Sequence, residues 1–396
     1  MPDLLMLILL LVAIAIGYFL GWRSAQKKQQ QSTTGRVLDK SYFKGLNLLL
    51  NEQPDAAIDT FIEALEVNSD TLETHLALGN MLRRQGEVDR AIRIHQNLLA
   101  HPGLSTLQQH HAQLELARDY IKAGLLDRAE RLFQELVESS QELKDICLEH
   151  LVEIYRDERE WEKAINAVEL LVGRRFSKFP VKWRCAQAHF CCELAEIALE
   201  KNDYLSARRH LKAALGYDKN LVRASLLWGQ LEYQLGHSRE ALKILKKIPH
   251  QDPDYLAEAL DLFVKCYEQL GDYQGLLKFL QHLQESHPSN SVILELTERI
   301  RQSQGDAAAA NFIGNQLKTR PSVKGVSKLL DFYLNHSKEK AQENLKLLKE
   351  LVDHLMASKP NYRCVHCGFT GKHLHWLCPS CKSWNTVKAI RGVEGE

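Results

Sequence analysis

Four of the nine cysteines in the sequence lie in one short stretch near its end. They form two Cys-x-x-Cys pairs, Cys364 with Cys367 and Cys378 with Cys381, and ten residues separate the pairs. Each pair can direct two sulfurs at one point, and two such pairs complete a tetrahedral site for a metal ion. Because four thiolates leave no open coordination position, the pattern predicts a site that holds structure and does not hydrolyse a substrate.

The residues around the pairs agree with this interpretation. Gly368 and Pro379 are typical of the tight turns that surround such sulfurs. Tetrahedral sulfur ligation suits either zinc or a single iron ion, and the sequence does not separate the two metals. Two disulfides or two redox pairs are the alternatives. The spacing favours a metal, because a redox Cys-x-x-Cys normally opens a helix beside a βαβ unit, which the sequence does not predict.

Three histidines, His366, His373 and His375, lie in the same region and could replace a sulfur. Four cysteines already fill a tetrahedral site, so we expect these histidines at the surface or beside the ligands. Elsewhere the sequence contains no His-Glu-x-x-His, no P-loop, no Gly-x-Ser-x-Gly and no dinucleotide glycine pattern. We therefore predict that the protein is not an enzyme. Its net charge of +1, with 26% charged residues, argues against a protein that binds nucleic acid through its overall charge. We therefore expect its partners to be proteins.

The sequence begins with an apolar run, residues 4–22, that contains no charged side chain. As a helix the run is about 28 Å long, which is enough to span the core of a bilayer. A cleaved signal peptide is the alternative, but no Lys or Arg precedes the run and no small-x-small site follows it. We predict a transmembrane anchor at residues 1–22 and a polar juxtamembrane linker at residues 23–37.

Two observations predict that the bulk of the chain is cytoplasmic. Arg23, Lys27, Lys28 and Arg36 follow the apolar run, and positive charge stays on the cytoplasmic side of a membrane. Five cysteines outside the pairs have no disulfide spacing and fit buried thiols in a reducing compartment. These cysteines are Cys147, Cys185, Cys191, Cys192 and Cys266.

The sequence pattern of residues 38–321 predicts an all-α array of helix pairs. A chain of 396 residues is too long for one compact core. Gly45 and Gly79 are 34 residues apart, as are Ala207 and Ala241, and this step resembles the tetratricopeptide repeat. About eight such units stack into a superhelical solenoid with a groove for protein partners. Small residues that let two helices approach closely recur at Ala57, Ala91, Ala129, Ala164, Ala207 and Ala241.

We predict that residues 322–360 form the terminal helices of the array. Helical spacing of apolar residues in the last of these helices predicts a stripe that docks on the array. The stripe consists of Leu345, Leu348, Val352 and Leu355. Pro360 ends the helix, so we expect the four-cysteine domain, residues 361–391, to lie against the end of the array. The Gly-rich, acidic tail, residues 392–396, is expected to be disordered.

The combination of an N-terminal span, a tetratricopeptide array and a terminal rubredoxin-like knuckle resembles the lipopolysaccharide assembly protein B family of Gram-negative bacteria. The resemblance covers the whole chain and implies that Cys364, Cys367, Cys378 and Cys381 ligate one iron ion, with zinc as the alternative. It also implies a single-pass protein of the inner membrane. Electron transfer is not expected, because ordinary rubredoxins have a much longer stretch between their two knuckles.

The resemblance further implies a regulatory adaptor. The family is thought to work with the membrane protease FtsH to promote degradation of the deacetylase that commits precursors to lipid A (LpxC). A scaffold that gathers lipopolysaccharide assembly enzymes at the inner membrane is the first alternative. A redox-sensing iron module is the second.

Overall fold

The computed structural model describes residues 48, 60, 71–173, 181–336, 339–393 and 395–396. The predicted anchor, the linker and Ala57 lie outside these ranges. None of the helices formed by the described ranges is both long and apolar enough to cross a membrane.

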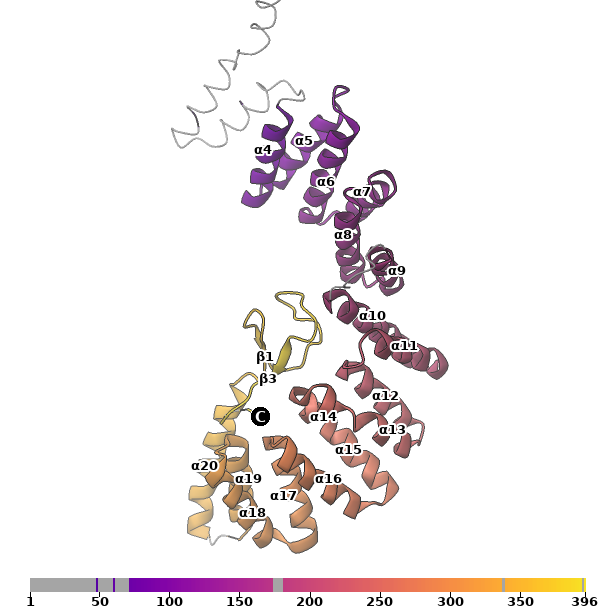
Figure 1. The fold of residues 1–396 in the computed structure, drawn as a ribbon. Coiled ribbons are helices and arrows are strands. Elements are labelled where there is room, and N and C mark those ends of the chain that lie inside the picture. The colour runs from indigo at the N-terminus through magenta and orange to yellow at the C-terminus, as the bar shows by residue number, and fades with distance from the viewer. Residues whose placement is uncertain (1–47, 49–59, 61–70, 174–180, 337–338, 394) are drawn as a thin grey trace, which may run out of the picture. The chain divides into compact units, whose positions relative to one another are not determined.

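The chain divides into two compact units, residues 1–147 and residues 148–396. In the described part of the first unit, α4 packs on α5 and α6 packs on α7 (Figure 1). These helices are α4 (Leu72–Gln85), α5 (Val88–Leu99), α6 (Thr106–Lys122) and α7 (Leu126–Ser139). The next helix, α8 (Lys144–Asp157), begins just before the boundary.

The second unit continues the alternation of helices and short turns as far as residue 357. Its helices after α8 are α9 (Trp161–Val172), α10 (Val181–Glu200), α11 (Tyr204–Tyr217), α12 (Val222–Gln234), α13 (Ser238–Leu245), α14 (Ile248–Gln251), the 3-10 helix η1 (Pro253–Tyr255), α15 (Leu256–Leu270), α16 (Tyr273–Ser286), α17 (Asn290–Gln304), α18 (Asp306–Thr319), α19 (Val323–His336) and α20 (Glu339–Ala357). Consecutive helices such as α10 and α11 or α12 and α13 contact each other. The fold is therefore a mostly helical tetratricopeptide array, as the repeat pattern predicted.

Small residues allow these helices to approach closely. A side chain added at Gly79 would collide with the imidazole of His95 on the paired helix, and one added at Gly229 would collide with Leu245. The predicted small positions in the described ranges are all fully buried. They are Ala91, Ala129, Ala164, Ala207 and Ala241.

Several helices end at a residue whose backbone adopts the left-handed conformation. Gly86, Gly124, Gly236 and Gly271 have φ values between 67° and 92°, a conformation that glycine adopts without strain. In two further turns a residue with a side chain stands at this position: Arg159 with φ of 60° and Asn202 with φ of 59°.

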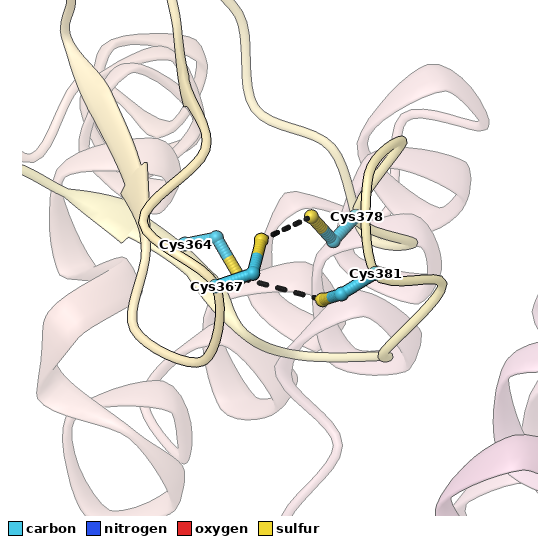
Figure 2. Close-up of side chains that lie close together, drawn as sticks. All are labelled: Cys364, Cys367, Cys378 and Cys381. Atoms are coloured by element: carbon cyan, nitrogen blue, oxygen red, sulfur yellow. Dashed lines mark hydrogen bonds between the residues drawn. The ribbon is translucent and has the colours of Figure 1, made fainter. Parts of the chain in front are cut away.

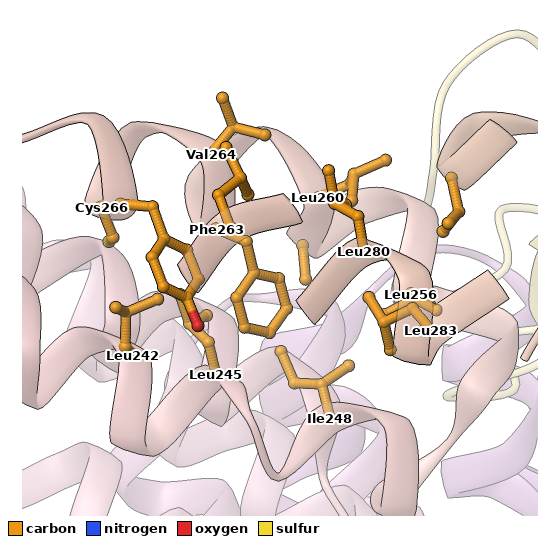
Figure 3. Close-up of a cluster of buried hydrophobic side chains, with 14 of the residues drawn as sticks. Leu242, Leu245, Ile248, Leu256, Leu260, Phe263, Val264, Cys266, Leu280 and Leu283 are labelled. Carbon is orange, nitrogen blue, oxygen red and sulfur yellow. The ribbon is translucent and has the colours of Figure 1, made fainter. Parts of the chain in front are cut away.

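The apolar faces of the helices meet in continuous cores. In the second unit, the cluster shown in Figure 3 joins α13, α15 and α16 through buried residues such as Leu245, Phe263 and Leu280. Tyr255 of η1 belongs to the same cluster. Burial of these side chains, each contributing about 1.5–3 kcal/mol, holds neighbouring repeats together.

A small sheet follows the last helix. It contains β1 (Tyr362–Cys364), β2 (Thr370–Gly371) and β3 (Val387–Ala389) in the order β2-β1-β3, and both pairs are antiparallel. Cys364 pairs with Val387 in this sheet. The sequence pattern did not predict these strands, because segments of two or three residues are too short to show an alternation.

The apolar stripe of α20 differs from the expectation of a buried face. Leu348 is 48% exposed and Leu355 is 60% exposed, while Leu345 and Val352 are half-buried. α20 packs on α19, but it is the last helix in the described part of the array, so no later helix covers the rest of its stripe.

The end of the chain also differs from the disordered tail that we expected. The Glu396 carboxylate accepts hydrogen bonds from the backbone N–H of Ser291 at 3.1 Å and from its hydroxyl at 2.5 Å. Lys324 contacts the same carboxylate at 3.2 Å, and Asn290 donates to the carbonyl of Gly395. Because Asn290 and Ser291 begin α17, the carboxylate lies at the positive end of that helix dipole.

Candidate metal centre

The four predicted cysteines meet in the segment that contains the small sheet. Cys364 ends β1, Cys367 follows it in a turn, and Cys378 and Cys381 lie in a second turn before β3. Figure 2 shows the four side chains converging, and their sulfurs all lie within 4.8 Å of one another.

The distances between the sulfurs fit a tetrahedral metal site. Cys364 Sγ lies 3.8 Å from Cys381 Sγ, and Cys367 Sγ lies 3.7 Å from Cys378 Sγ. A metal–sulfur bond of about 2.3 Å requires the sulfurs of a regular tetrahedron to be about 3.8 Å apart. A disulfide requires about 2.05 Å, so this geometry favours a metal over two disulfides.

The two turns that carry the sulfurs have the same backbone geometry. In the first turn, Gly368 donates to the carbonyl of Cys364 at 3.0 Å, and Cys364 donates to the carbonyl after Gly368 at 2.7 Å. In the second turn, Lys382 donates to the carbonyl of Cys378 at 2.9 Å, and Cys378 donates to the carbonyl after Lys382 at 3.0 Å. Both Gly368 and Lys382 have positive φ, 81° and 54°. The sequence indicated the turn at Gly368, whereas the matching position of Lys382 was missed because glycine is absent there.

Hydrogen bonds and burial shift the pKa values of two of the four thiols in opposite directions. Hydrogen bonds from Ser383 and His366 lower the pKa of Cys381 to about 5, so this sulfur is ready to act as a thiolate ligand. Burial raises the pKa of Cys378 to about 11, because that sulfur lies inside the segment among the other thiols. A cation among the four sulfurs would favour the thiolate form of each.

The three histidines of the region are not part of the four-sulfur cluster. Among the described residues, the candidate metal-binding group here consists of the four cysteines. His366 lies beside Cys381, whose hydrogen bond raises the pKa of the imidazole. His375 packs against the edge of Phe369, with ring centroids 6.0 Å apart.

Comparison with known proteins matches each part of this description. Residues 362–389 match the family described as rubredoxin metal binding domain, and residues 74–103 and 198–262 match tetratricopeptide repeat families. Lipopolysaccharide assembly protein B of Escherichia coli (strain K12) is 39% identical over 392 residues, which cover 99% of both chains. The chain belongs to the lipopolysaccharide assembly protein B family.

A second protein of the same family is also similar along its whole length. Lipopolysaccharide assembly protein B of Haemophilus influenzae is 34% identical over 399 residues, covering 98% of this chain and 99% of the relative. A solved structure, Naa15/Naa10 bound to HypK-THB, is similar over 81% of this chain and 50% of its own chain, with 16% identity and a TM-score of 0.49. The matched families are repeats and a metal-binding domain, and none of them is a catalytic domain.

In this member of the lipopolysaccharide assembly protein B family, the metal centre does not lie only against the end of the array. Trp384 stacks on His189 of α10 with centroids 4.3 Å apart, and it meets the ring of Phe190 edge-on at 6.0 Å. Trp376 packs against Tyr255 of η1 at 5.1 Å. Proximity to Pro360 in sequence suggested the last repeats, but these aromatic side chains bury their surface against much earlier helices.

Polar contacts fix the same placement. Tyr362 donates to Glu258 of α15 at 2.6 Å, and the hydroxyl of Tyr255 donates to the carbonyl of Val387 at 3.1 Å. Lys388 bonds to both Asp252 and Asp254, at 3.0 and 2.6 Å. The sheet that positions Cys364 is therefore tied to η1 and α15 on both of its long strands.

Proposed function

We propose that Cys364, Cys367, Cys378 and Cys381 bind one metal ion, iron or zinc, and that the ion stabilises the knuckle that packs on α10 and η1. The sulfur spacing and the match to the rubredoxin metal binding domain support this assignment. When bound, such an ion supplies folding energy to a segment whose own sheet is too small to be stable alone.

We further propose that the protein is an adaptor anchored in the inner membrane by residues 1–22, with its bulk in the cytoplasm. In this proposal it presents the lipid A committing deacetylase (LpxC) to the protease FtsH and so limits lipopolysaccharide synthesis. The observation that carries the proposal is the end-to-end similarity to proteins named lipopolysaccharide assembly protein B, over 99% of this chain.

Each part has a physical role in this mechanism. An anchor converts a bulk encounter with a membrane protease into a local one and raises the effective concentration. The helix array, residues 38–321 with the terminal helices 322–360, binds the client. The four-cysteine domain, residues 361–391, fixes α10 relative to η1 and α15, because it contacts all three elements.

The half-life of the deacetylase tests this proposal. We would deplete the protein in its host, block translation and follow the deacetylase, then restore either the wild type or Cys364→Ser. Longer survival of the deacetylase on depletion is expected, with rescue by the wild type only. An unchanged half-life would reject the adaptor. Rescue by a version that lacks residues 1–22 at native abundance would reject the role of the anchor.

A scaffold for lipopolysaccharide assembly enzymes is the second candidate, because the relatives are named assembly proteins and tetratricopeptide repeats bind proteins. It predicts stoichiometric co-purification with several synthesis enzymes and no change in their turnover. Quantitative mass spectrometry of the purified complex, combined with the half-life measurement, separates the two candidates.

A further inference from the structure

A small cavity lies where the second cysteine turn meets α8 and α10. Its volume is about 200 Å³, and aromatic rings form much of its wall. Trp183 and Phe190 come from α10, and Trp384 comes from the turn after Cys381. Val152, Cys185 and Ala186 complete the apolar lining. All of the residues that line the cavity belong to the second unit.

The size of the cavity indicates what can enter it. Sites that enclose a small-molecule ligand usually have roughly 300–1,000 Å³, so this cavity is too small for a complete metabolite. It is suited to one bulky side chain of a larger partner. Aromatic walls favour an aliphatic or aromatic side chain, since the apolar surface of both partners then leaves water.

Charged side chains surround the cavity with an excess of cations. Arg156, Lys182 and Lys382 line it together with one acid, Glu153. The imidazole of His150, whose Nδ1 lies 3.8 Å from the Glu153 carboxylate, lowers the pKa of Glu153, so this carboxylate is ionised. Asp157 pairs with Arg156 at 3.0 Å.

The two lysines are the cations of the lining that lie outside an ion pair in the described part of the chain, and the charge of Lys182 also helps to lower the pKa of Glu153. Lys182 and Lys382 are both exposed, and neither forms an ion pair within the part of the chain that the structure describes. The ammonium of Lys182 lies over the ring of Trp183, 4.6 Å from its centroid, at the edge of the apolar wall. The two lysines come from different elements, α10 and the second cysteine turn.

We propose that this cavity, with Lys182 and Lys382, is a docking site for an acidic peptide segment of a protein partner. One bulky apolar side chain of the segment enters the space between Trp183, Phe190 and Trp384, and carboxylates on either side of it pair with the two lysines. The charge excess selects acidic over basic segments, and the aromatic walls supply the anchor. The identification of that partner as the proteolytic client rests on the proposed function, whereas the binding itself does not.

A peptide titration tests the proposal directly. The probe is a short peptide, blocked at both ends, with one central leucine and two glutamates on either side. It is titrated into the purified full-length chain in detergent while tryptophan fluorescence is followed, because two of the six tryptophans line the cavity. Three matched peptides replace the leucine by alanine, replace the glutamates by lysines, or leave the C-terminal carboxylate unblocked.

Two variants and a control accompany the titration. Lys182→Glu reverses one charge, and Lys382→Asn removes the other while suiting the positive φ at that position. Lys212→Ala removes an exposed lysine of α11 that does not line the cavity. Metal content and the thermal midpoint, measured for each variant, show whether the fold is intact.

We expect saturable binding of the acidic leucine peptide, weakened about tenfold or more when Lys182→Glu and Lys382→Asn are combined in one chain, and unchanged by Lys212→Ala. The alanine and lysine peptides should bind at least about tenfold more weakly, and added salt should weaken the acidic peptide. No saturation by about 1 mM, or equal affinity for the lysine peptide, would overturn the proposal. Tight binding of the unblocked peptide alone would replace it with recognition of a chain terminus.

The outcome is separable from the proposed function. Peptide binding that depends on the two lysines, together with an unchanged half-life of the deacetylase, would retain the docking site and reject the adaptor. A deacetylase that is stabilised on depletion, together with no peptide binding, would retain the adaptor and reject this site.

Discussion

The imidazole of His189 lies flat on the indole of Trp384, with ring centroids 4.3 Å apart and planes inclined by 14°. The contact joins α10, in the middle of the chain, to the turn that follows Cys381. Because Phe190 meets the same indole edge-on, Trp384 connects the metal centre to the array through two neighbouring residues of one helix.

Loss of this indole should weaken the whole second unit. Trp384→Ala removes a half-buried side chain that contacts both rings, and we expect it to lower the free energy of unfolding by about 2–3 kcal/mol, less than a fully buried tryptophan would cost. Urea denaturation followed by circular dichroism measures the change. Trp384→Phe should recover part of it. An unchanged midpoint for Trp384→Ala would show that the contact does not stabilise the fold.

His189 should make stability depend on pH. Burial and the nearby positive charge of Arg223 hold the pKa of His189 well below its usual range, while Asn385 opposes them weakly. The folded protein therefore favours the neutral ring, and the unfolded chain binds a proton near pH 6.5. The stability contributed by the neutral ring is present above pH 6.5 and is lost as the pH falls below it.

The variant His189→Phe isolates this effect, because it keeps an aromatic ring against Trp384 and removes the titration. Urea midpoints of the wild type and the variant, measured from pH 7.5 to pH 5, should diverge on acidification, with the wild type losing more stability. Parallel curves would indicate that His189 does not carry the pH dependence.

Metal removal should unfold the knuckle and leave the helices in place. Structural tetrathiolate sites contribute about 10–16 kcal/mol in apparent terms, and the sheet itself pairs only two or three residues on each strand. A chelator, or Cys381→Ser, should release one equivalent of metal and shift tryptophan emission to the red as Trp376 and Trp384 become exposed. Far-ultraviolet circular dichroism should change little, since the helices lie outside residues 362–389.

Cys266→Ala is the matched control for that experiment, because Cys266 is a fully buried thiol of α15 outside the four-sulfur cluster. It should retain the metal. An emission spectrum that is unchanged after complete metal loss would contradict the interpretation that the ion holds the knuckle against α10.

The sequence predicted those features that depend on local spacing. The 34-residue step and its small residues, such as Ala129 and Ala241, predicted the helix pairs because each pair needs a close approach at a fixed position. The two Cys-x-x-Cys pairs predicted the convergence of four sulfurs, because each pair forms its own turn.

Features that depend on contacts distant in sequence were not predicted. The stacking of Trp384 on His189 has no local signal, and proximity along the chain indicated the wrong helices for it. The exposed Leu348 and Leu355 show the same difficulty: periodicity identifies an apolar face but does not show whether another element covers it. The cavity beside Trp183 was missed because its lining comes from three separate elements.

Arg159 stands where other turns of the array have glycine, and replacing it should stabilise the protein. Its N–H donates to the carbonyl of Arg156, and the next N–H donates to the carbonyl of Tyr155, the same arrangement that closes the turn at Gly271. With φ of 60°, Arg159 adopts a left-handed conformation that is costly for a residue with a Cβ.

We expect Arg159→Gly to raise the free energy of unfolding by about 0.5–1 kcal/mol, because relief of this strain exceeds the extra chain entropy that glycine gains on unfolding. Gly271→Ala is the reciprocal variant. Apart from Gly271 and its two chain neighbours, no atom lies within 4 Å of a Cβ built there, so the expected loss of about 1 kcal/mol would report backbone strain alone. Urea denaturation of both variants provides the measurement. A loss of stability in Arg159→Gly would show that the arginine side chain makes a contribution larger than the strain.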